Sequence, residues 1–299
     1  MERPDIKKIS KFVKPYRISR GKGFRLKDID PGDTQGLESA LKGDAKALLA
    51  QGVQLLTEEQ SRLYAQDRWG VLLLFQAMDA AGKDGTIKHV TSGIDPQGMQ
   101  VYSFKTPSTE ELDHDFMWRC MKALPERGRI GIFNRSYYEE VVVVRVHEAY
   151  LKGQRLPGEL ITPKIWKQRF EDIRAIERFL ARNGYLILKF FLHVSKKEQK
   201  KRFLERLDQP QKNWKFSPAD VGERQYWNAY MHAYEDMICN TATDYAPWYV
   251  VPADNKWFTR MIVSAAIVER MESLKLKFPE VDEAKRKALA QARAALLKK

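Results

Sequence analysis

The stretch from Leu72 to Gly85 constrains the fold of this chain more than any other. An apolar run ends at Met78, and a turn of small residues that carries Lys83 follows it. The run predicts a strand that ends near Met78, and the turn predicts a helix that begins near Lys83. Backbone N–H groups at the start of such a helix point at one anion, and the lysine adds a mobile positive charge. We interpret the stretch as a phosphate-binding loop.

The loop departs from the usual G-x-x-x-x-G-K-[ST] pattern at two positions. Ala77 stands in place of the first glycine, and Asp84 replaces the hydroxyl residue that would contact magnesium. Asp79 adds a carboxylate inside the loop, where a second anion is costly unless a metal ion or a proton joins it. Asp79 therefore indicates a magnesium site. An ordinary strand-to-helix turn with an exposed lysine is the alternative.

Strand-like and helix-like segments alternate along the rest of the chain. Capping residues start the expected helices: Thr57 opens one that runs to about Asp67, Ser108 opens one that stops by Pro125, and Thr162, Ser195 and Ser217 open others. In the helix after Thr162 we expect a buried stripe of Trp166, Phe170, Ile173, Ile176 and Phe179. The further predicted strands are residues 99–104, 130–133, 185–194 and 248–251. This alternation predicts an α/β fold, a parallel sheet with helices on both faces and ligands at the carboxyl ends of its strands.

The sequence divides into three parts by composition. Residues 1–50, rich in turns and basic clusters, predict an extended or partly ordered N-terminal extension. Residues 51–278 contain all the predicted strands and form the expected phosphate-binding domain, with a lid around residues 200–222. Residues 279–299, rich in Ala, Lys, Arg and Leu, predict a basic helical tail.

A second polar group follows the strand predicted at residues 130–133. Asn134 and Arg135 come directly after it, at a position where related folds often present a carboxylate to magnesium. The guanidinium of Arg135 is a planar fork of donors that matches a phosphoryl group. A salt-bridged arginine at a strand end is the alternative.

The third group is the basic segment from Lys200 to Ser217. Arg202 and Arg206 share one helix face, and a Pro-containing piece with Lys212 and Lys215 follows. Such a segment is typical of a lid that closes cations over phosphates, whereas a solvated basic helix face is the alternative. We expect its aromatic residues, Trp214 and Phe216, to pack in the core.

The overall charge narrows the class of partner. The chain carries 52 basic and 39 acidic residues, a net charge of +13, which predicts an anionic partner or substrate. No common nucleic-acid-binding signature is present, and the five histidines show no metal-ligand spacing. No apolar run is long enough to span a bilayer, and the first residues lack a signal peptide. We expect a cytoplasmic protein with no membrane or nucleic-acid partner.

Several long segments together resemble the polyphosphate kinase 2 family. These are residues 76–88, 133–139, 188–193, 205–215 and 243–250, and the resemblance covers roughly residues 20–275. It implies a thymidylate-kinase-like P-loop kinase fold with a helical lid. It also implies transfer of a terminal phosphoryl group between inorganic polyphosphate and a nucleotide, with Mg²⁺ as cofactor.

The resemblance also implies roles for individual residues. Asp79, Lys83 and Arg135 become the catalytic residues, with Asp79 linked to the metal. The lid contacts to the phosphate chain become Arg202, Arg206, Lys212 and Lys215. The residues expected to bind phosphate or nucleotide are Ala81, Gly82, Asp84, Gly85, Lys88, Asn134 and Glu139.

The acceptor is expected to be a nucleoside diphosphate, ADP giving ATP or the reverse. Many family members carry Asp where this chain has Asn134, and the amide predicts AMP as an acceptor besides ADP, with GDP/GTP as further nucleotides. We also expect a homo-oligomer, a dimer or a tetramer. The competing hypotheses are an ATP-dependent nucleoside monophosphate kinase and a non-enzymatic nucleic-acid-binding protein.

Overall fold

One sheet of six strands forms the centre of the computed structural model, which describes residues 6–37 and 42–297. The strand order is β1-β6-β5-β2-β4-β3; β1 runs antiparallel to β6, and every other neighbouring pair is parallel. The strands are β1 (Arg17–Ile18), β2 (Gly70–Ala77), β3 (Met99–Ser103), β4 (Ile130–Asn134), β5 (Tyr185–His193) and β6 (Trp248–Pro252). The four predicted strands after β2 are confirmed, each within one residue of its expected bounds.

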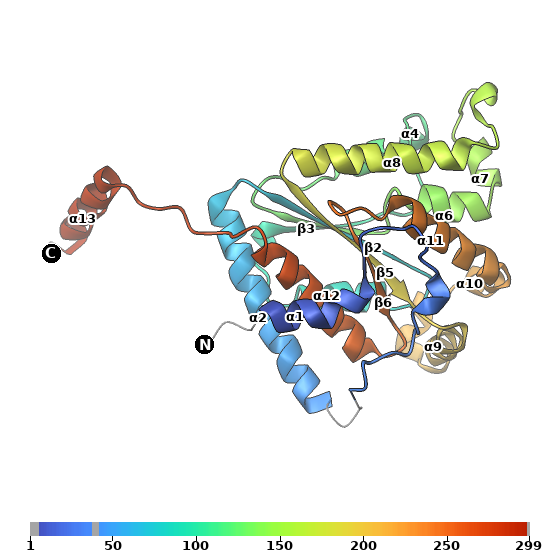
Figure 1. Cartoon of the computed structure of the whole chain (residues 1–299), viewed down its shortest axis with the longest axis horizontal. Coiled ribbons are helices and arrows are strands. Elements are labelled where there is room, and N and C mark those ends of the chain that lie inside the picture. Colours follow the sequence, from blue (N-terminus) through green and yellow to red (C-terminus); the bar gives the residue numbers. More distant parts are fainter. Residues whose placement is uncertain (1–5, 38–41, 298–299) are drawn as a thin grey trace.

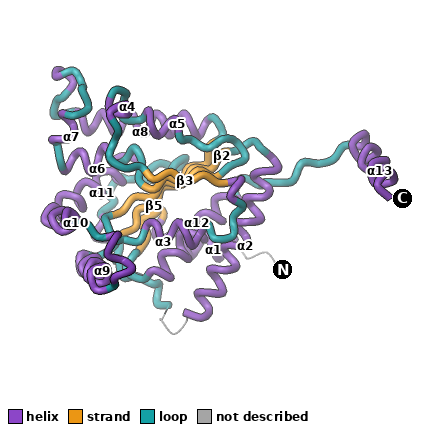
Figure 2. Tube along the Cα trace, turned by 180° about the vertical axis from the view of Figure 1, so that it is seen from behind, coloured by secondary structure: helices purple, strands orange, loops and turns teal. Residues whose placement is uncertain are grey.

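Helices cover both faces of this sheet, as predicted. On one face lie α1 (Ile6–Val13), α2 (Lys42–Gln66), α3 (Lys83–Val90) and α12 (Lys256–Glu272), and Figure 2 shows them together on one side of the strands. The other face is covered by α6 (Glu139–Val146), α8 (Ile165–Arg182) and α11 (Trp227–Thr241) (Figure 1). The remaining helices are α4 (Thr109–Leu112), α5 (Trp118–Lys122), α7 (Ala149–Lys152), α9 (Lys196–Asp208), α10 (Pro218–Glu223) and α13 (Glu283–Leu297).

The central strands are apolar because both of their faces are covered. Every residue of β2 is buried, and so is every residue of β5 except Tyr185. Strands of a parallel sheet buried on both sides read as continuous apolar runs, which is the pattern at residues 72–78. The edge strand β3 has no such cover, and Val101 and Tyr102 are exposed.

Three helix predictions are wrong in their extent. The helix expected to open at Thr162 begins at Ile165, and Lys164 is its N-cap. The helix expected to start at Thr57 begins at Lys42, and Thr57 lies within it with its hydroxyl 2.9 Å from the Val53 carbonyl, a bond made inside a helix rather than at a cap. The helix capped by Ser108 has the expected capping box but ends at Leu112; a second short helix, α5, follows at Trp118.

The stripe predicted for α8 is partly wrong. Phe170 and Ile173 are buried, but Phe179 is 57% exposed. Ile165, Glu177 and Leu180 complete the buried face instead. Helical periodicity alone did not reveal that a charged residue takes the place of an apolar one.

The described part of the N-terminal segment folds against the domain. Helix α1 packs on α12, and β1 adds to the sheet beside β6. Tyr16 is buried, its ring makes an edge contact with Phe258, and its hydroxyl donates to Asp33 Oδ2 at 2.6 Å. The segment is therefore docked on the domain rather than extended away from it.

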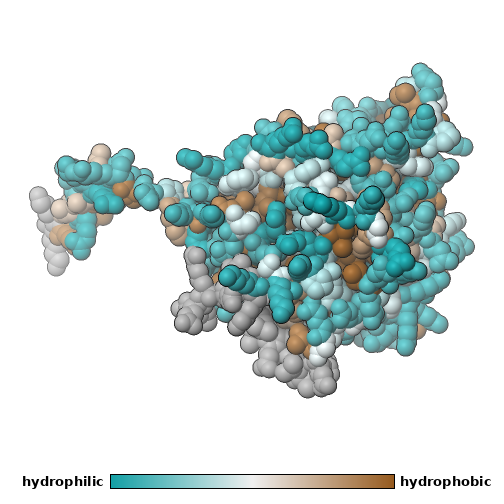
Figure 3. Space-filling model, viewed as in Figure 1, coloured by the Kyte–Doolittle hydropathy of each residue, from teal (hydrophilic) through white to brown (hydrophobic). Residues whose placement is uncertain are grey.

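The C-terminal helix α13 stands apart from the rest of the chain. All of its described side chains are exposed, and Figure 1 shows it separated from the body by a connecting segment. On the face of the molecule drawn in Figure 3, the side chains of α13 are mostly hydrophilic. Among the described residues, no helix is long and apolar enough to cross a membrane.

The docking of the N-terminal segment predicts a large stability effect at Tyr16. Tyr16→Ala should lower the free energy of unfolding by about 3–5 kcal/mol, because it removes a buried aromatic ring and leaves a cavity beside Phe258. Urea denaturation measures this effect. Lys14→Ala, two residues away and exposed, is the control and should stay near wild type. Equal midpoints for the two variants would mean that this segment does not contribute to the core.

Candidate functional site

The predicted phosphate-binding loop joins β2 to α3. Residues 78–82 form the turn, and α3 begins at Lys83. Gly82 has φ 104° and Ala80 has φ 61°, so two residues adopt the left-handed conformation within one short turn. That conformation costs free energy for a residue with a Cβ, such as Ala80, and is maintained only where surrounding contacts fix it. The backbone N–H groups of the first turn of α3 lie at the positive end of the helix, which favours an anion there.

Arg202 on α9 supplies contacts that fix the conformation of the phosphate-binding loop. One of its terminal nitrogens, Nη1, donates to the Ala80 carbonyl at 3.1 Å and to the Ala81 carbonyl at 2.8 Å. The other, Nη2, donates to the carbonyls of Ala253 at 2.6 Å and Asp254 at 3.0 Å. The guanidinium therefore ties the phosphate loop to the segment that follows β6.

Arg202, predicted as a lid contact to the phosphate chain, lines the cleft but is itself buried. The residue is only 4% exposed, and its Nε donates to Glu198 Oε1 at 2.9 Å. Its donors are engaged by the protein itself, which favours a role in holding the loop. The i, i+4 spacing of Arg202 and Arg206 did not distinguish a buried arginine from an exposed one.

The side chains of Lys83, Asp79 and Arg135 lie close together at the loop. Lys83 Nζ donates to the Ala77 carbonyl at 2.8 Å, and burial lowers the pKa of Lys83 although the charge of Asp79 opposes this shift. Arg135 Nη2 lies 3.2 Å from Asp79 Oδ1 and its Nη1 lies 3.9 Å from Glu139 Oε2. Burial raises the pKa of Glu139, and the charge of Arg135 partly offsets this. The phosphate-binding loop and the end of β4 therefore lie next to each other.

The backbone is strained where Arg135 leaves β4. Arg135 has φ 65°, a left-handed conformation that is costly for a residue with a long side chain, and its N–H donates to the Phe75 carbonyl at 3.0 Å. The preceding residue, Asn134, donates from Nδ2 to Asp84 Oδ1 at 2.7 Å. This hydrogen bond joins the strand end to the first turn of α3.

The part of the predicted lid that follows α9 in the chain packs against that helix. Arg206 donates to the Lys215 carbonyl at 3.2 Å and lies 3.7 Å from Asp220. The side chain of Asn213 donates to the carbonyls of Arg206 and Leu207 at 2.7 and 2.9 Å. Trp214 is 78% exposed, so its predicted place in the core is wrong, whereas Phe216 is half-buried against Phe203.

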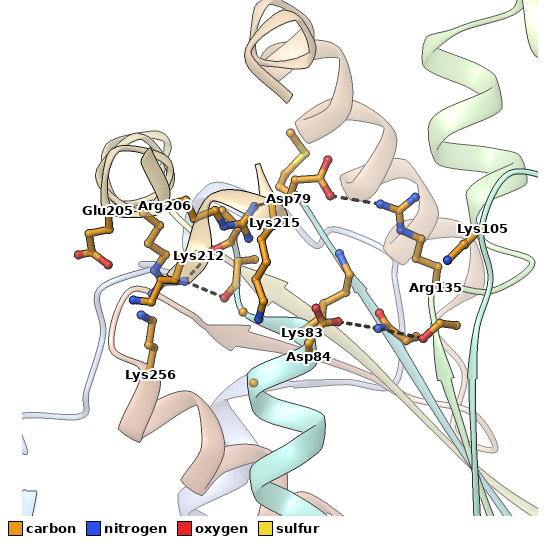
Figure 4. Close-up of a pocket in the computed structure, with 18 of the residues that line it drawn as sticks. Asp79, Lys83, Asp84, Lys105, Arg135, Glu205, Arg206, Lys212, Lys215 and Lys256 are labelled. Carbon is orange, nitrogen blue, oxygen red and sulfur yellow. Dashed lines mark hydrogen bonds and ion pairs between the residues drawn. The ribbon is translucent and has the colours of Figure 1, made fainter. Parts of the chain in front are cut away.

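These elements enclose a cleft of about 590 Å³. Figure 4 shows Lys83 and Asp84 near its middle, with Arg206, Lys212 and Lys256 on one side and Arg135 and Lys105 on the other. Among the described residues, eight basic and three acidic side chains line it. The predicted site residues in this lining are Asp79, Ala81, Gly82, Lys83, Asp84, Gly85, Asn134, Arg135, Arg202, Arg206, Lys212 and Lys215. The lining therefore carries an excess of positive charge, which favours an anionic ligand.

Two predicted residues lie outside this lining. Lys88 is exposed on α3, more than one turn beyond the loop, and Glu139 contacts the site through Arg135. The cleft also contains two lysines that the sequence pattern did not identify, Lys105 and Lys256. Lys105 comes two residues after β3 and Lys256 four residues after β6, so the rule that ligands bind at the carboxyl ends of parallel strands could have found both.

The carboxylate that the cleft offers fits a magnesium ion that is bound mainly by the phosphates of the substrate. Nowhere in residues 6–37 and 42–297 do three His, Cys, Asp or Glu side chains form a metal-binding group. Mg²⁺, however, is usually bound by one or two carboxylates together with phosphates and water. Asp79 is a partly exposed carboxylate beside the phosphate loop and meets this requirement.

Comparison with known proteins places the chain in a family. The sequence model described as polyphosphate kinase 2 matches residues 40–279. A relative from Rhodopseudomonas palustris, named ADP-polyphosphate phosphotransferase, is 58% identical over 84% of this chain and 87% of its own length. A relative from Meiothermus ruber, named AMP/ADP-polyphosphate phosphotransferase, is 42% identical over 93% of this chain and 100% of its own length.

A solved structure agrees with the sequence comparison. The crystal structure of polyphosphate kinase 2 from Arthrobacter aurescens TC1 superposes with a TM-score of 0.84 at 39% identity, over 94% of this chain and 96% of that chain. The chain belongs to the polyphosphate kinase 2 family. The predicted P-loop kinase fold is confirmed.

The contacts of Arg202 predict that it stabilises the protein. Arg202→Met should lower the free energy of unfolding by about 3 kcal/mol, because it leaves buried carbonyls and Glu198 without their partner. The change is measured by urea denaturation. Lys200→Met, an exposed position on the same helix, is the matched control and should stay near wild type. If both variants unfolded at the wild-type midpoint, Arg202 would not be the residue that holds the loop.

Proposed function

We propose that this protein transfers the terminal phosphoryl group of inorganic polyphosphate to ADP, forming ATP, and catalyses the reverse reaction. The observation that carries the proposal is the cleft, in which basic side chains extend to both sides of one phosphate-binding loop. A single nucleotide does not require cations on both sides. Two phosphate chains that meet end to end at the loop do.

The side of the cleft formed by Arg206, Lys212 and Lys256 is the proposed polyphosphate site. Partial burial and the neighbouring charges of Arg202 and Lys212 lower the pKa of Lys256. Burial is the main cause of this shift, and the charge of Glu205 opposes it. An anionic chain beside Lys256 would favour its charged form. Each phosphate of the chain brings at least one negative charge, which also accounts for the net charge of +13.

The side formed by Arg135 and Lys105 is the proposed nucleotide site. A second cavity of about 450 Å³ shares residues 103–106 with the cleft. Its wall includes Phe104, whose ring lies 5.4 Å from the guanidinium carbon of Arg119. An aromatic ring and a guanidinium fit a nucleobase, while Lys105 and Arg135 face its phosphates.

The residues of the loop then supply positioning and charge. Lys83 and the backbone of residues 82–85 hold the terminal phosphate of the donor, and Arg135 stabilises the charge that spreads over the phosphoryl group during transfer. Asp79 would hold Mg²⁺ and orients Arg135 through their ion pair. When bound, the metal ion neutralises charge between the two phosphate chains. An oxygen of the acceptor's terminal phosphate attacks the terminal phosphorus of polyphosphate in line, the bridging P–O bond to the next phosphate breaks, and a chain one phosphate shorter leaves. No covalent enzyme intermediate is required.

Asn134 bears on the choice of acceptor. Its amide donates to Asp84, and both residues line the cleft, so an uncharged group lies beside this carboxylate. We propose AMP as a second acceptor, because an amide repels a phosphate in a different position less than a carboxylate would. The name of the Meiothermus ruber relative, an AMP/ADP-polyphosphate phosphotransferase, supports this proposal.

The main alternative is an ATP-dependent nucleoside monophosphate kinase. That function shares the fold, but Asp84 replaces the hydroxyl residue that usually contacts the magnesium of ATP. A nucleic-acid-binding protein would use the positive charge but leaves Asp79 and the strained Arg135 without a purpose. The family match also favours polyphosphate.

An assay with three substrate combinations tests the proposed function. Protein, Mg²⁺ and ADP should form ATP with polyphosphate, whereas ATP and AMP without polyphosphate should form ADP at a much lower rate. Asp79→Asn and Lys83→Ala should each lower kcat by about a hundredfold to a thousandfold, because each removes charge from the reacting centre. Lys167→Ala, an exposed change on α8, is the control. ATP formation that is equal in Lys83→Ala and wild type, with unchanged circular dichroism, would reject the assignment of the loop.

The two sides of the cleft predict opposite kinetic effects. The double variant Lys212→Ala/Lys256→Ala should raise the KM for polyphosphate at least about tenfold and change the KM for ADP less than about twofold, because both changes remove charge from the polyphosphate side alone. Lys105→Ala should show the reverse. Added salt should raise the KM for polyphosphate, since the Debye length is ~8 Å at physiological ionic strength. Equal effects on both substrates would contradict the assignment of sides.

A further inference from the structure

A fully buried ion pair lies behind the turn that carries Arg135. Glu177 on α8 and Lys189 on β5 are both 0% exposed, and Lys189 Nζ lies 2.7 Å from Glu177 Oε2. The ammonium also donates to the Tyr138 hydroxyl at 2.9 Å and to the Thr241 carbonyl at 2.8 Å. All three of its protons therefore have acceptors. Burial lowers the pKa of Lys189, and the charge of Glu177 opposes this shift.

Two tyrosines connect this pair to the active-site turn. Tyr137 and Tyr138 follow Arg135 at a distance of two and three residues, and both donate to Glu177 Oε1, at 2.9 and 2.7 Å. Burial, followed by the charge of Glu177, raises the pKa of both hydroxyls, so they remain protonated donors. The carboxylate thus accepts two hydroxyls and one ammonium. A buried polar network in which every member has a partner is rigid, and this one therefore holds the two tyrosines in place.

Stability alone does not explain such a network. A buried ion pair can often be replaced by apolar residues of similar volume without loss of stability, because desolvation of the two charges offsets their attraction. What the network adds is a fixed position for the tyrosines. Arg135 adopts φ 65°, a conformation that persists only if its surroundings hold it.

The other flank of the turn is held by a second set of contacts. Ser136 is 0% exposed, and its Oγ accepts from the Tyr138 N–H at 3.2 Å. The amide nitrogen of Gln76 donates to Glu139 Oε1 at 2.8 Å, and its amide oxygen accepts from Ser136 Oγ at 3.1 Å. This orientation of the amide gives both of its polar atoms a partner. Arg135 is thereby fixed between β2 on one flank and the Glu177–Lys189 pair on the other.

We propose that the Glu177–Lys189 pair, acting through the hydroxyls of Tyr137 and Tyr138, positions the guanidinium of Arg135 for phosphoryl transfer. These four are positioning residues, since none of them lines the cleft. The inference rests on the proposed function and adds to it a buried network that positions Arg135. Loss of the hydroxyls lets the turn relax, so that Arg135 occupies its transfer position for a smaller fraction of the time while the substrates still bind.

Kinetics of hydroxyl deletions test the first part of the proposal. Tyr137→Phe/Tyr138→Phe should lower kcat at least about tenfold and change both KM values less than about twofold, because positioning matters only in the transition state. Tyr137→Phe alone leaves every Lys189 contact in place and should lower kcat about threefold. Tyr185→Phe is the matched control. It removes a hydroxyl that donates to the Pro125 carbonyl, and Tyr185 lies at the start of β5, the end away from the cleft. This control should keep the wild-type kcat.

A double-mutant cycle separates positioning from a general structural role. If the tyrosines act through Arg135, their substitution in an Arg135→Ala background should change kcat less than about twofold. Thermal denaturation of every variant shows that the assays are made on folded protein. An equally large loss of kcat in both backgrounds, or losses that parallel a fall in melting temperature, would overturn the inference. A wild-type protein inactive with polyphosphate and ADP would overturn the proposed function as well, which distinguishes the two failures.

Discussion

Repulsion among the basic side chains of the cleft is the constraint on which the surrounding structure depends. Eight of them line one space of about 590 Å³ in the described chain. Without fixed partners, such side chains would turn outward to water. The fold holds three of the eight with carbonyls and carboxylates: Lys83 with the Ala77 carbonyl, Arg135 with Asp79, and Arg202 with four backbone carbonyls.

The parallel sheet makes this concentration of charge possible. The loops after β2, β3, β4 and β6 all leave the same edge, so residues far apart in sequence meet there. The N-terminus of α3 adds partial positive charge at the centre of the edge. A phosphate chain approaching from the α9 side and another from the β3 side would both end at Lys83. The buried network behind Arg135 then fits the same scheme, because a strained turn beside a charged cleft requires rigid support.

Local patterns predicted much of this arrangement from sequence. The loop at residues 78–85 and the strand before Asn134 were identified because each depends on a continuous apolar run and a few neighbouring residues. The docking of β1 could not be predicted, since a two-residue strand gains its place only from its partner β6. Likewise, nothing in the sequence around Arg202 separates a buried arginine from an exposed one. Its carbonyl partners near residues 80 and 253 become neighbours only after folding.

The positive charge of the cleft should be neutralised by a phosphate chain, and the rest of the proposed function depends on this interaction. Thermal denaturation of the wild-type protein with increasing polyphosphate, without nucleotide, tests it most directly. We expect a rising melting temperature, equivalent to ~2.7 kcal/mol of added stability at about 100 times Kd, and a smaller rise at high salt. A melting temperature that polyphosphate does not change, or a rise that is the same at low and high salt, would contradict this expectation.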